Sequence, residues 1–359
     1  MPISVKVYRS TDTGAPTLPS TASSLINVLD ACLVNGFGSV TLNSLVVSSN
    51  VATGTVSTGH GFTLAGSTGP VIRVAGAAPS GLNGDSRIAS IPNATTFTFA
   101  TTGISDQTAT GTVTAKRAPA GFAKTYSGTN KAVYRSDDIA GTRIPLQIND
   151  SSGNYFTASM YESMTDVDTG TNGVSVGGYK DTSNHWVIVA DSIAFYLFVK
   201  SAYSDWRSHV YFGDIINYKP SDQYHCALIG CPVGGYTSRL IDLNDLNDSY
   251  LCRNYTQFGS AVSMQRRSHT ISGSRIGSAG NSYPSAIDDS FHAWPIEVWE
   301  ASGSRGLMPG MWNPLHSNSG PSQFSVIDGV PQLLGRDLMV CKLDPYGWCA
   351  MDITGPWRE

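Results

Sequence analysis

Residues 45–116 read LVVSSNVATGTVSTGHGFTLAGSTGPVIRVAGAAPSGLNGDSRIASIPNATTFTFATTGISDQTATGTVTAK. Short runs of Val, Ile, Thr and Phe recur in this stretch, and clusters of Gly, Pro, Asn and Ser separate them. This pattern is typical of consecutive β-strands joined by tight turns. In one run, alternation places Phe97 and Phe99 on the same face of a strand. The stretch therefore predicts a self-contained β-module.

The segments on either side of the module predict a host domain that the module interrupts. Residues 1–8 alternate between apolar and polar side chains, with Ile3, Val5 and Val7 on one face. Such alternation indicates a strand, which we expect at a sheet edge or in an arm that reaches a neighbouring subunit. Residues 1–43 form too little structure to fold alone, so we expect them to join residues 118–233.

Residues 23–35 carry the clearest helical pattern in the chain. One face of this helix would hold four apolar residues: Leu25, Leu29, Cys32 and Leu33. The N-cap candidates are Ser20, Thr21 and Ser23. Gly36 stands where a C-cap glycine is expected. Asp30 is the one charged residue in the helix, so we expect both sides of the helix to be covered.

Further strands are predicted after the module. The host domain continues with candidate strands at 131–134, 143–148 and 159–164. Residues 185–190 and 194–199 are apolar on both faces, which favours a central hairpin, and strands at 210–215 and 226–230 follow. We therefore expect a discontinuous host domain of residues 1–43 plus 118–233, an inserted module of residues 44–117, and a C-terminal region of residues 234–359.

The C-terminal region divides into two parts. Residues 234–290 lack regular periodicity and are rich in Gly, Ser, Asn and Tyr, which predicts a loop-rich segment that is functional or held by partners. Residues 296–300 alternate cleanly, and residues 337–343 and 348–353 form a predicted hairpin around Asp344-Pro345-Tyr346-Gly347. The tryptophans crowd this half of the chain. Core packing is expected for most of them, and a contact role for some.

Composition narrows the function classes. Charged residues make up 14% of the chain, against about 25% in ordinary globular proteins, which favours assembly with neighbours. The net charge is −4 and no Lys/Arg block occurs, so nucleic-acid binding is not expected. No apolar run approaches the ~20 residues of a membrane span, and no secretory signal is recognised at residues 1–14.

Four phrases within the module resemble an Ig-like β-sandwich module inserted into tail and other virion proteins of tailed bacteriophages: Gly59-His60-Gly61-Phe62, Val74-Ala75-Gly76-Ala77, Gly81-Leu82-Asn83-Gly84 and Ala94-Thr95-Thr96-Phe97-Thr98. The flanking residues 31–38 and 122–136, and residues 305–316, also look like segments of phage structural proteins. With the periodicities above, we expect a mainly β fold with β-sandwich-type domains, one N-terminal amphipathic helix and an inserted small β-sandwich module.

This resemblance implies a non-enzymatic structural protein of a tailed-phage virion, made in the cytoplasm of the host bacterium. We expect a tail or baseplate subunit that contacts other copies of itself and other virion proteins, without a cofactor. Two alternatives are a minor capsid or decoration protein on the outer capsid surface, and a tail adhesin that binds a host receptor or surface glycan. The candidates for packing and assembly are Leu25, Leu29, Leu33, Val5, Val7, Trp299 and Trp312.

No catalytic constellation stands out in the sequence. A glycoside hydrolase would need paired carboxylates, and the candidates are Asp288, Asp289, Glu297 and Glu300. Glu297 and Glu300 fall on opposite faces of an alternating strand, which disfavours a shared site. Neither a Gly-x-Ser-x-Gly elbow nor a His-Glu-x-x-His motif occurs. A hydrolase is therefore the least favoured function class.

Metal binding is also weakly supported. One candidate zinc set matches no known ligand spacing: His225, Cys226, Cys231, Cys252 and His269. Buried thiols or a single disulfide are the favoured interpretation. Residues 242–248 hold an oxygen-rich cluster that suits either calcium or Asx turns. Asp166 departs from an EF-hand pattern and predicts a polar turn, and His60 predicts a turn or packing role.

Overall fold

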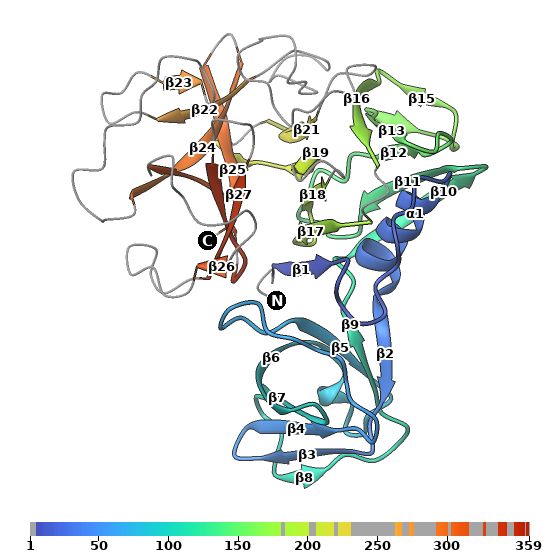
Figure 1. The fold of residues 1–359 in the computed structure, drawn as a ribbon, viewed down its shortest axis with the longest axis vertical. Coiled ribbons are helices and arrows are strands. Elements are labelled where there is room, and N and C mark those ends of the chain that lie inside the picture. Colours follow the sequence, from blue (N-terminus) through green and yellow to red (C-terminus); the bar gives the residue numbers. More distant parts are fainter. Residues whose placement is uncertain are drawn as a thin grey trace.

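The computed structural model describes residues 5–180, 184–200, 206–218, 222–230, 263–267, 273–275, 292–300, 303–315, 326–327, 337–342, 348–355 and 357–358. The fold is mainly β, with 51% strand and one 12-residue helix near the N-terminus. The strands form several antiparallel sheets, one of them a curled half-barrel that lies apart from the others at the bottom of Figure 1. The predicted fold class is confirmed.

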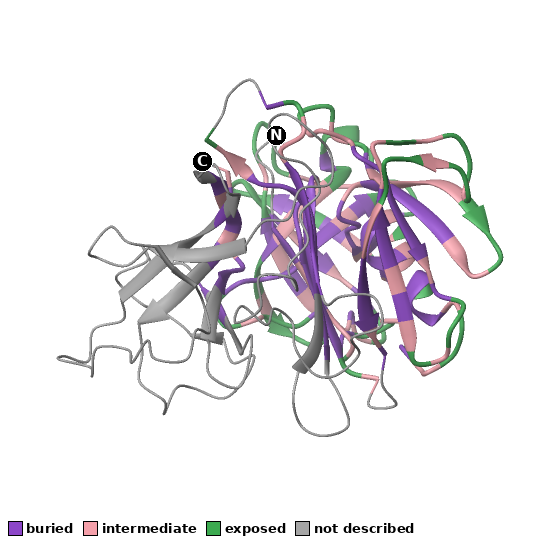
Figure 2. Ribbon diagram, turned by 90° about the horizontal axis from the view of Figure 1, so that it is seen from above, coloured by how far each residue is buried: buried purple, intermediate pink, exposed green. Residues whose placement is uncertain are grey.

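The central sheet has five strands in the order β1-β17-β18-β19-β21. Its strands are β1 (Lys6–Arg9), β17 (Trp186–Ala190), β18 (Ala194–Lys200), β19 (Trp206–Asp214) and β21 (Cys226–Ile229). All five residues of β17 are buried, and Figure 2 shows that the strands in the interior of the chain are mostly buried. The predicted apolar hairpin is therefore confirmed, as is the placement of the N-terminal strand at an edge of its sheet.

One face of the central sheet packs on a second five-stranded sheet and on the helix. The strands of this sheet are β10 (Phe122–Gly128), β11 (Lys131–Ser136), β12 (Leu146–Asn149), β13 (Tyr155–Met160) and β16 (Val174–Tyr179), with β14 (Ser163–Met164) and β15 (Gly170–Thr171) as a small hairpin. Trp186 and Phe195 of the central sheet share this core with Tyr134 and Phe156. The three elements together form a β-sandwich with a helix against it.

The other face of the central sheet packs on the C-terminal sheet. The strands of that sheet are β22 (Ser263–Arg267), β23 (Gly273–Arg275), β24 (His292–Glu300), β25 (Gly303–Leu315), β26 (Val326–Ile327), β27 (Leu338–Lys342) and β28 (Trp348–Asp352), and β20 (Ile216–Asn217) pairs with β25. Tyr196 and Phe198 meet Met308, Met351 and Trp357 in this second core. The chain body therefore has three layers, with the central sheet in the middle.

Two predictions for the C-terminal region have different outcomes. The hairpin around 344–347 is confirmed, because β27 and β28 pair antiparallel. A loop-rich segment was expected across 234–290, but residues 263–267 and 273–275 are strands β22 and β23. β22 pairs with β24, so its stability comes from a neighbouring strand rather than from its own sequence pattern. The rest of 234–290 lies outside the described residues.

The module is an eight-stranded sheet with a core of its own. Its elements are β2 (Phe37–Thr41), β3 (Ser44–Ser48), β4 (Val51–Thr55), β5 (Val71–Ala75), η2 (Ser80–Leu82), β6 (Gly84–Asn93), β7 (Thr96–Ala100), β8 (Gln107–Thr108) and β9 (Thr114–Arg117). β2 pairs with β9, so the sheet begins at Phe37, before the expected boundary at 44. Gly36 has φ +73°, and a Cβ there would lie 2.3 Å from the Arg117 carbonyl oxygen. Glycine thus permits the outgoing and returning strands to run together.

The helix consists of α1 (Ser24–Leu29) and a π-helical segment, η1 (Asp30–Asn35). Its predicted apolar face, formed by Leu25, Leu29, Cys32 and Leu33, is fully buried. The backbone N–H groups of Ala120 and Gly121 donate to carbonyls at its C-terminal end. Asn27 and Asn35 are its exposed residues, so the expectation that both sides are covered is wrong for the side that carries them.

The expected N-cap is corrected by the structure. Ser23 makes no side-chain cap hydrogen bond. Instead, Asp150 Oδ2 accepts from the Leu25 N–H at 2.8 Å, and Asp150 Oδ1 pairs with Lys180 in a contact with no exposed side-chain surface. The cap therefore comes from the end of β12, because a buried carboxylate can satisfy the helix donors and its cation together.

We predict that the double substitution Leu29→Ala with Leu33→Ala prevents stable folding. Each truncation of a buried leucine costs ~2–5 kcal/mol, and a typical domain has only ~5–15 kcal/mol of stability. Urea unfolding of the full chain measures the loss. The matched control is Asn27→Ala on the exposed side of the same helix, which should leave the midpoint nearly unchanged. An unaltered midpoint in the double variant would contradict the assigned packing.

Candidate functional site

Buried charged groups in the described part of the chain gather where the sheets meet. One group, the module junction, comprises Lys6, Asp12, Asp85, Arg87 and Arg117. A second group, the Asp214 cluster, comprises Thr142, Asp191, Asp214, His225 and Arg358. Both groups join segments that lie far apart in sequence. They are the strongest candidates in the described residues for a site, because their charged side chains are brought together only by the fold.

The first contact of the module junction links β1 to the module. Lys6 Nζ lies 2.9 Å from Asp85 Oδ2 and 2.6 Å from the Pro119 carbonyl oxygen. Arg73 Nε donates to the other oxygen of Asp85 at 2.7 Å. The Lys6 side chain is 10% exposed, so the strand that starts the central sheet is anchored to the module by a mostly buried ion pair.

Two arginines complete the module junction. Arg87 donates to three backbone carbonyl oxygens, those of Gly69 at 2.9 Å, Val5 at 2.6 Å and Thr354 at 3.1 Å. These acceptors belong to the module, the N-terminal strand and the C-terminal end. Arg117 Nη2 pairs with Asp12 Oδ1 at 2.6 Å. The Arg87 guanidinium therefore binds three separate parts of the chain.

The space that remains at this junction is small. It is a cavity of about 10 Å³ with Arg9, Arg87, Arg117, Asp12 and Thr68 among its lining residues. A volume of that order holds roughly one water molecule. Nearby, Ser67 and Thr68 of the module donate to the buried carboxylate of Asp337. The junction is therefore suited to fixing an orientation rather than to enclosing an organic substrate.

The charges of the module junction shift the pKa of Asp85. Burial alone would raise the pKa of Asp85, but its hydrogen bond with Arg73 and the charge of Lys6 outweigh burial and hold the pKa below its usual value. A carboxyl group with a depressed folded pKa stabilises the fold above its unfolded pKa of ~3.9, and this stabilisation is lost as the pH falls.

We therefore predict that acid loosens the module junction. The free energy of unfolding should fall as the pH drops below about 4, the ordinary pKa of aspartate, and Asp85→Asn should remove part of that dependence. Chemical unfolding at a series of pH values measures both. Asp106→Asn in an exposed turn of the same module is the control. If Asp85→Asn and wild type had parallel pH profiles, the Asp85 contacts would not stabilise the fold.

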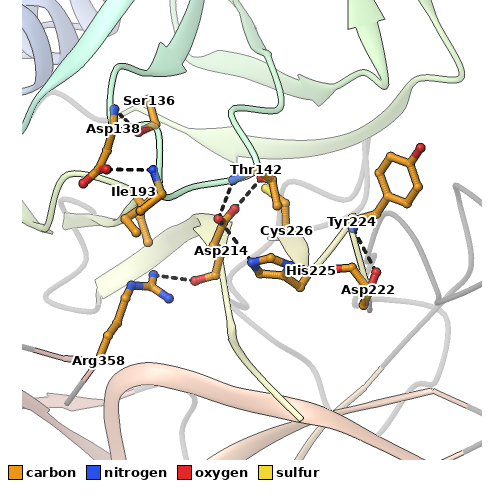
Figure 3. A network of polar contacts seen from close by, with 12 residues as sticks. Ser136, Asp138, Thr142, Ile193, Asp214, Asp222, Tyr224, His225, Cys226 and Arg358 are labelled. Carbon is orange, nitrogen blue, oxygen red and sulfur yellow. Dashed lines mark hydrogen bonds and ion pairs between the residues drawn. The ribbon is translucent and has the colours of Figure 1, made fainter. Parts of the chain in front are cut away.

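Figure 3 shows the Asp214 cluster, in which Thr142, His225 and Arg358 lie around Asp214. Asp214, at the end of β19, accepts from Thr142 Oγ1 at 2.5 Å and from the Thr142 N–H at 2.7 Å. His225 Nε2 lies 3.5 Å from Asp214 Oδ2, and its Nδ1 lies 2.7 Å from the Asp222 carbonyl oxygen. Burial raises the pKa of Asp214, although Thr142, His225 and Arg358 act in the other direction.

Arg358 ties the end of the chain to this cluster. Its Nε lies 3.1 Å from Asp191 Oδ2, and its Nη2 donates to the Asp214 carbonyl oxygen at 2.6 Å. The Asp191 side chain has no exposed surface, and its other oxygen accepts from the N–H groups of Ile193 and Ala194. The carboxylate therefore closes the β17–β18 turn on one side and holds Arg358 on the other.

We predict that Arg358→Ala strongly destabilises the chain. It leaves the buried Asp191 carboxylate without its cation, a change that typically costs about 3–5 kcal/mol. Arg358→Lys retains the charge but not the second donor to Asp214, so its loss should be smaller. Thermal and urea unfolding of both variants provide the measurement. Equal stability of Arg358→Ala and wild type would be inconsistent with this role.

The sequence-predicted packing residues lie mostly inside the chain. Leu25, Leu29, Leu33 and Val5 are fully buried, and Val7 is partly buried against the second core. They therefore pack within one subunit in the structure. Trp299 and Trp312 lie on β24 and β25, and their side chains are outside the described residues.

The structure also shows where several of the candidate carboxylates and His60 lie. Glu297 and Glu300 lie on β24, while Asp288 and Asp289 fall outside the described residues. His60 is buried, accepts from the Phe62 N–H at 2.9 Å and stacks on the Phe62 ring, which confirms the packing role. Asp166 accepts from the Asp168 N–H at 2.7 Å, which confirms the polar turn.

Of the candidate metal ligands, Cys226 is buried, and its Sγ lies 3.5 Å from Met160 Sδ. Cys231, Cys252, His269 and residues 242–248 lie outside the described residues. Within the described ranges, no group of three or more His, Cys, Asp or Glu residues is placed to hold a metal ion. No helix in that part of the chain is long and apolar enough to cross a membrane.

Sequence reasoning missed Arg87, Asp214 and Arg358. Their partners lie far away in the chain, for example 267 residues for Arg87 and Thr354. The one available signal was an acidic residue directly after an apolar run, as in Asp191 after β17 and Asp214 at the end of β19. No model of a known protein family matches the chain, and a search of curated proteins finds no matching sequence.

Proposed function

We propose that this chain is a non-enzymatic structural subunit of a tailed-phage virion, located in the tail or baseplate. The observation that carries the proposal is the module junction. The module projects from the three-layer body (Figure 1) and is held at its base by Lys6, Arg87 and Arg117. A projection that is fixed by buried polar contacts transmits contact geometry to neighbours, which is what a subunit of a symmetric assembly requires.

The use of charge in the chain supports the same function. The buried carboxylates of Asp12, Asp191 and Asp222 each pair with an arginine from a distant segment. Loss of either partner of such a buried pair is strongly destabilising, so these pairs hold distant segments of the chain together. The low overall charge, 14% of residues, is consistent with a surface that is partly covered by other subunits. The proposed partners are copies of the chain itself and other virion proteins.

We expect antibodies against the purified chain to label the tail or baseplate of phage particles from a strain that expresses it. Immunogold electron microscopy of intact particles provides the measurement, and particles from a strain with the gene deleted are the control. Label confined to the outer capsid surface would instead assign a decoration role. Particles without the chain by both labelling and mass spectrometry would refute a virion role.

Acid-to-amide substitutions separate the structural function from a hydrolase. Asp288→Asn, Asp289→Asn, Glu297→Gln and Glu300→Gln should leave phage titre and particle assembly intact, whereas Leu29→Ala with Leu33→Ala should abolish assembly. Titre is measured beside glycan release from host cells. Loss of both titre and glycan release in an acid-to-amide variant that still assembles would replace the structural function with a hydrolase.

A further inference from the structure

The cavity at the module junction, here called the junction cavity, is lined by more positive than negative side chains. Its lining includes three guanidinium groups, those of Arg9, Arg87 and Arg117, and one carboxylate, that of Asp12. Three positive charges against one negative charge leave a formal excess of two positive charges. Arg9 ends β1 of the host domain, whereas Arg87 lies on β6 and Arg117 ends β9 of the module. The excess therefore exists only when the module lies against the host.

The carboxylate of Asp12 is already engaged on both oxygens. Its Oδ1 pairs with Arg117 Nη2 at 2.6 Å, and its Oδ2 accepts from the backbone N–H of Arg9 at 2.9 Å. The guanidinium of Arg9 forms no hydrogen bond and no ion pair with any described residue, although its charge acts on Asp12 from a greater distance. A guanidinium carries five N–H donors and no acceptor, so Arg9 presents donors to the junction cavity.

The positive charge of Arg87 is also only partly balanced. Its three hydrogen bonds all go to neutral backbone carbonyl oxygens, and it forms no ion pair within the described part of the chain. The charges of Asp337 and Asp352 act on it from further away. Burial nevertheless lowers the pKa of Arg87, and it lowers the pKa of Arg117 in the same way. A buried charge without a close counterion is costly, so the site favours an added negative charge.

The size of the junction cavity restricts the ligand. Its volume of about 10 Å³ corresponds to roughly one water molecule, so a sulfate or phosphate ion does not fit within it. A water molecule would fill the space but would leave the excess charge unbalanced. The remaining lining is mostly apolar, with Val7, Ala65 and Pro70 among its residues. Guanidinium groups are weakly hydrated cations, and together with apolar walls they suit a weakly hydrated monovalent anion.

We propose that the junction cavity binds one monovalent anion of the size of chloride, held among the guanidinium groups of Arg9, Arg87 and Arg117. The anion lies between β1 of the host domain and β6 and β9 of the module, so it binds only when the module is docked. A ligand that binds only the folded arrangement stabilises it as the concentration of the ligand rises. Anion binding thereby strengthens the attachment of the module, and this inference does not depend on the proposed virion function.

Urea unfolding of the full chain in sodium chloride and in sodium gluconate, at equal total salt, tests the energetic consequence. Urea is chosen because it adds no anion. We expect the wild type to be more stable in chloride, with the folded-to-unfolded ratio rising up to tenfold for each tenfold increase in chloride above its dissociation constant. Arg9→Gln should lose most of this response and should still fold in gluconate, because the Arg9 guanidinium has no bond to a described residue.

The matched control is Arg73→Gln. Arg73 belongs to the same junction through its hydrogen bond with Asp85, but it is not among the residues that line the cavity. Arg73→Gln should therefore be less stable than wild type in both salts and should retain the response to chloride. Equal chloride responses in wild type and Arg9→Gln would overturn the site, as would a wild type that does not respond to chloride at all.

Bromide locates the anion directly, because its anomalous X-ray scattering identifies it in a crystal. For crystals of the full-length chain grown in sodium bromide, we expect an anomalous peak in the junction cavity beside Arg9 and Arg117, and no such peak in crystals of Arg9→Gln. Bromide found only elsewhere on the molecule would overturn the proposal. Stabilisation by sulfate but not by chloride or bromide would also overturn it, because the ligand would then be larger than the cavity.

Discussion

The middle strands of the central sheet, β17 and β18, are buried on both faces along their described residues, and the rest of the structure depends on that constraint. These strands are covered on one side by the helix and the β10–β16 sheet, and on the other side by the C-terminal sheet. A sheet buried on both faces needs apolar residues at successive positions, which β17 and β18 supply. Each flanking layer is therefore required to shield the apolar side chains of the central strands from water.

Layers that are packed by apolar contact can still slide or tilt, and the buried polar contacts restrict that freedom. Hydrogen bonds and ion pairs are directional, and a buried charge that loses its partner is costly. Arg87 binds carbonyl oxygens of three segments, and Arg358 binds the turn and strand end formed by Asp191 and Asp214. These contacts select one arrangement of the layers and one orientation of the module.

The module has a hydrophobic core of its own, but its base is held by contacts with the host domain. Its fifteen buried core residues come from within residues 42–115, as expected for an inserted unit. Yet Asp85 and Arg117, which lie in or beside that unit, are partners of Lys6 and Asp12 in the host. The module therefore has its own hydrophobic core, whereas its charged residues at the base pair with residues of the host domain. This combination gives a subunit a projection whose direction is set by the body.

Local periodicity was enough to predict the apolar face of the helix, the central hairpin of β17 and β18, the final hairpin of β27 and β28, and the module itself, because each of these signals arises between residues a few positions apart. The tertiary structure alone decided the rest. Asp150 caps the helix from the end of β12, Arg87 reaches Thr354, and His225 meets Asp214 only when the chain has folded. Such contacts join residues whose separation leaves no periodic trace in the sequence, and a single buried charge reveals its partner only when the two are brought together.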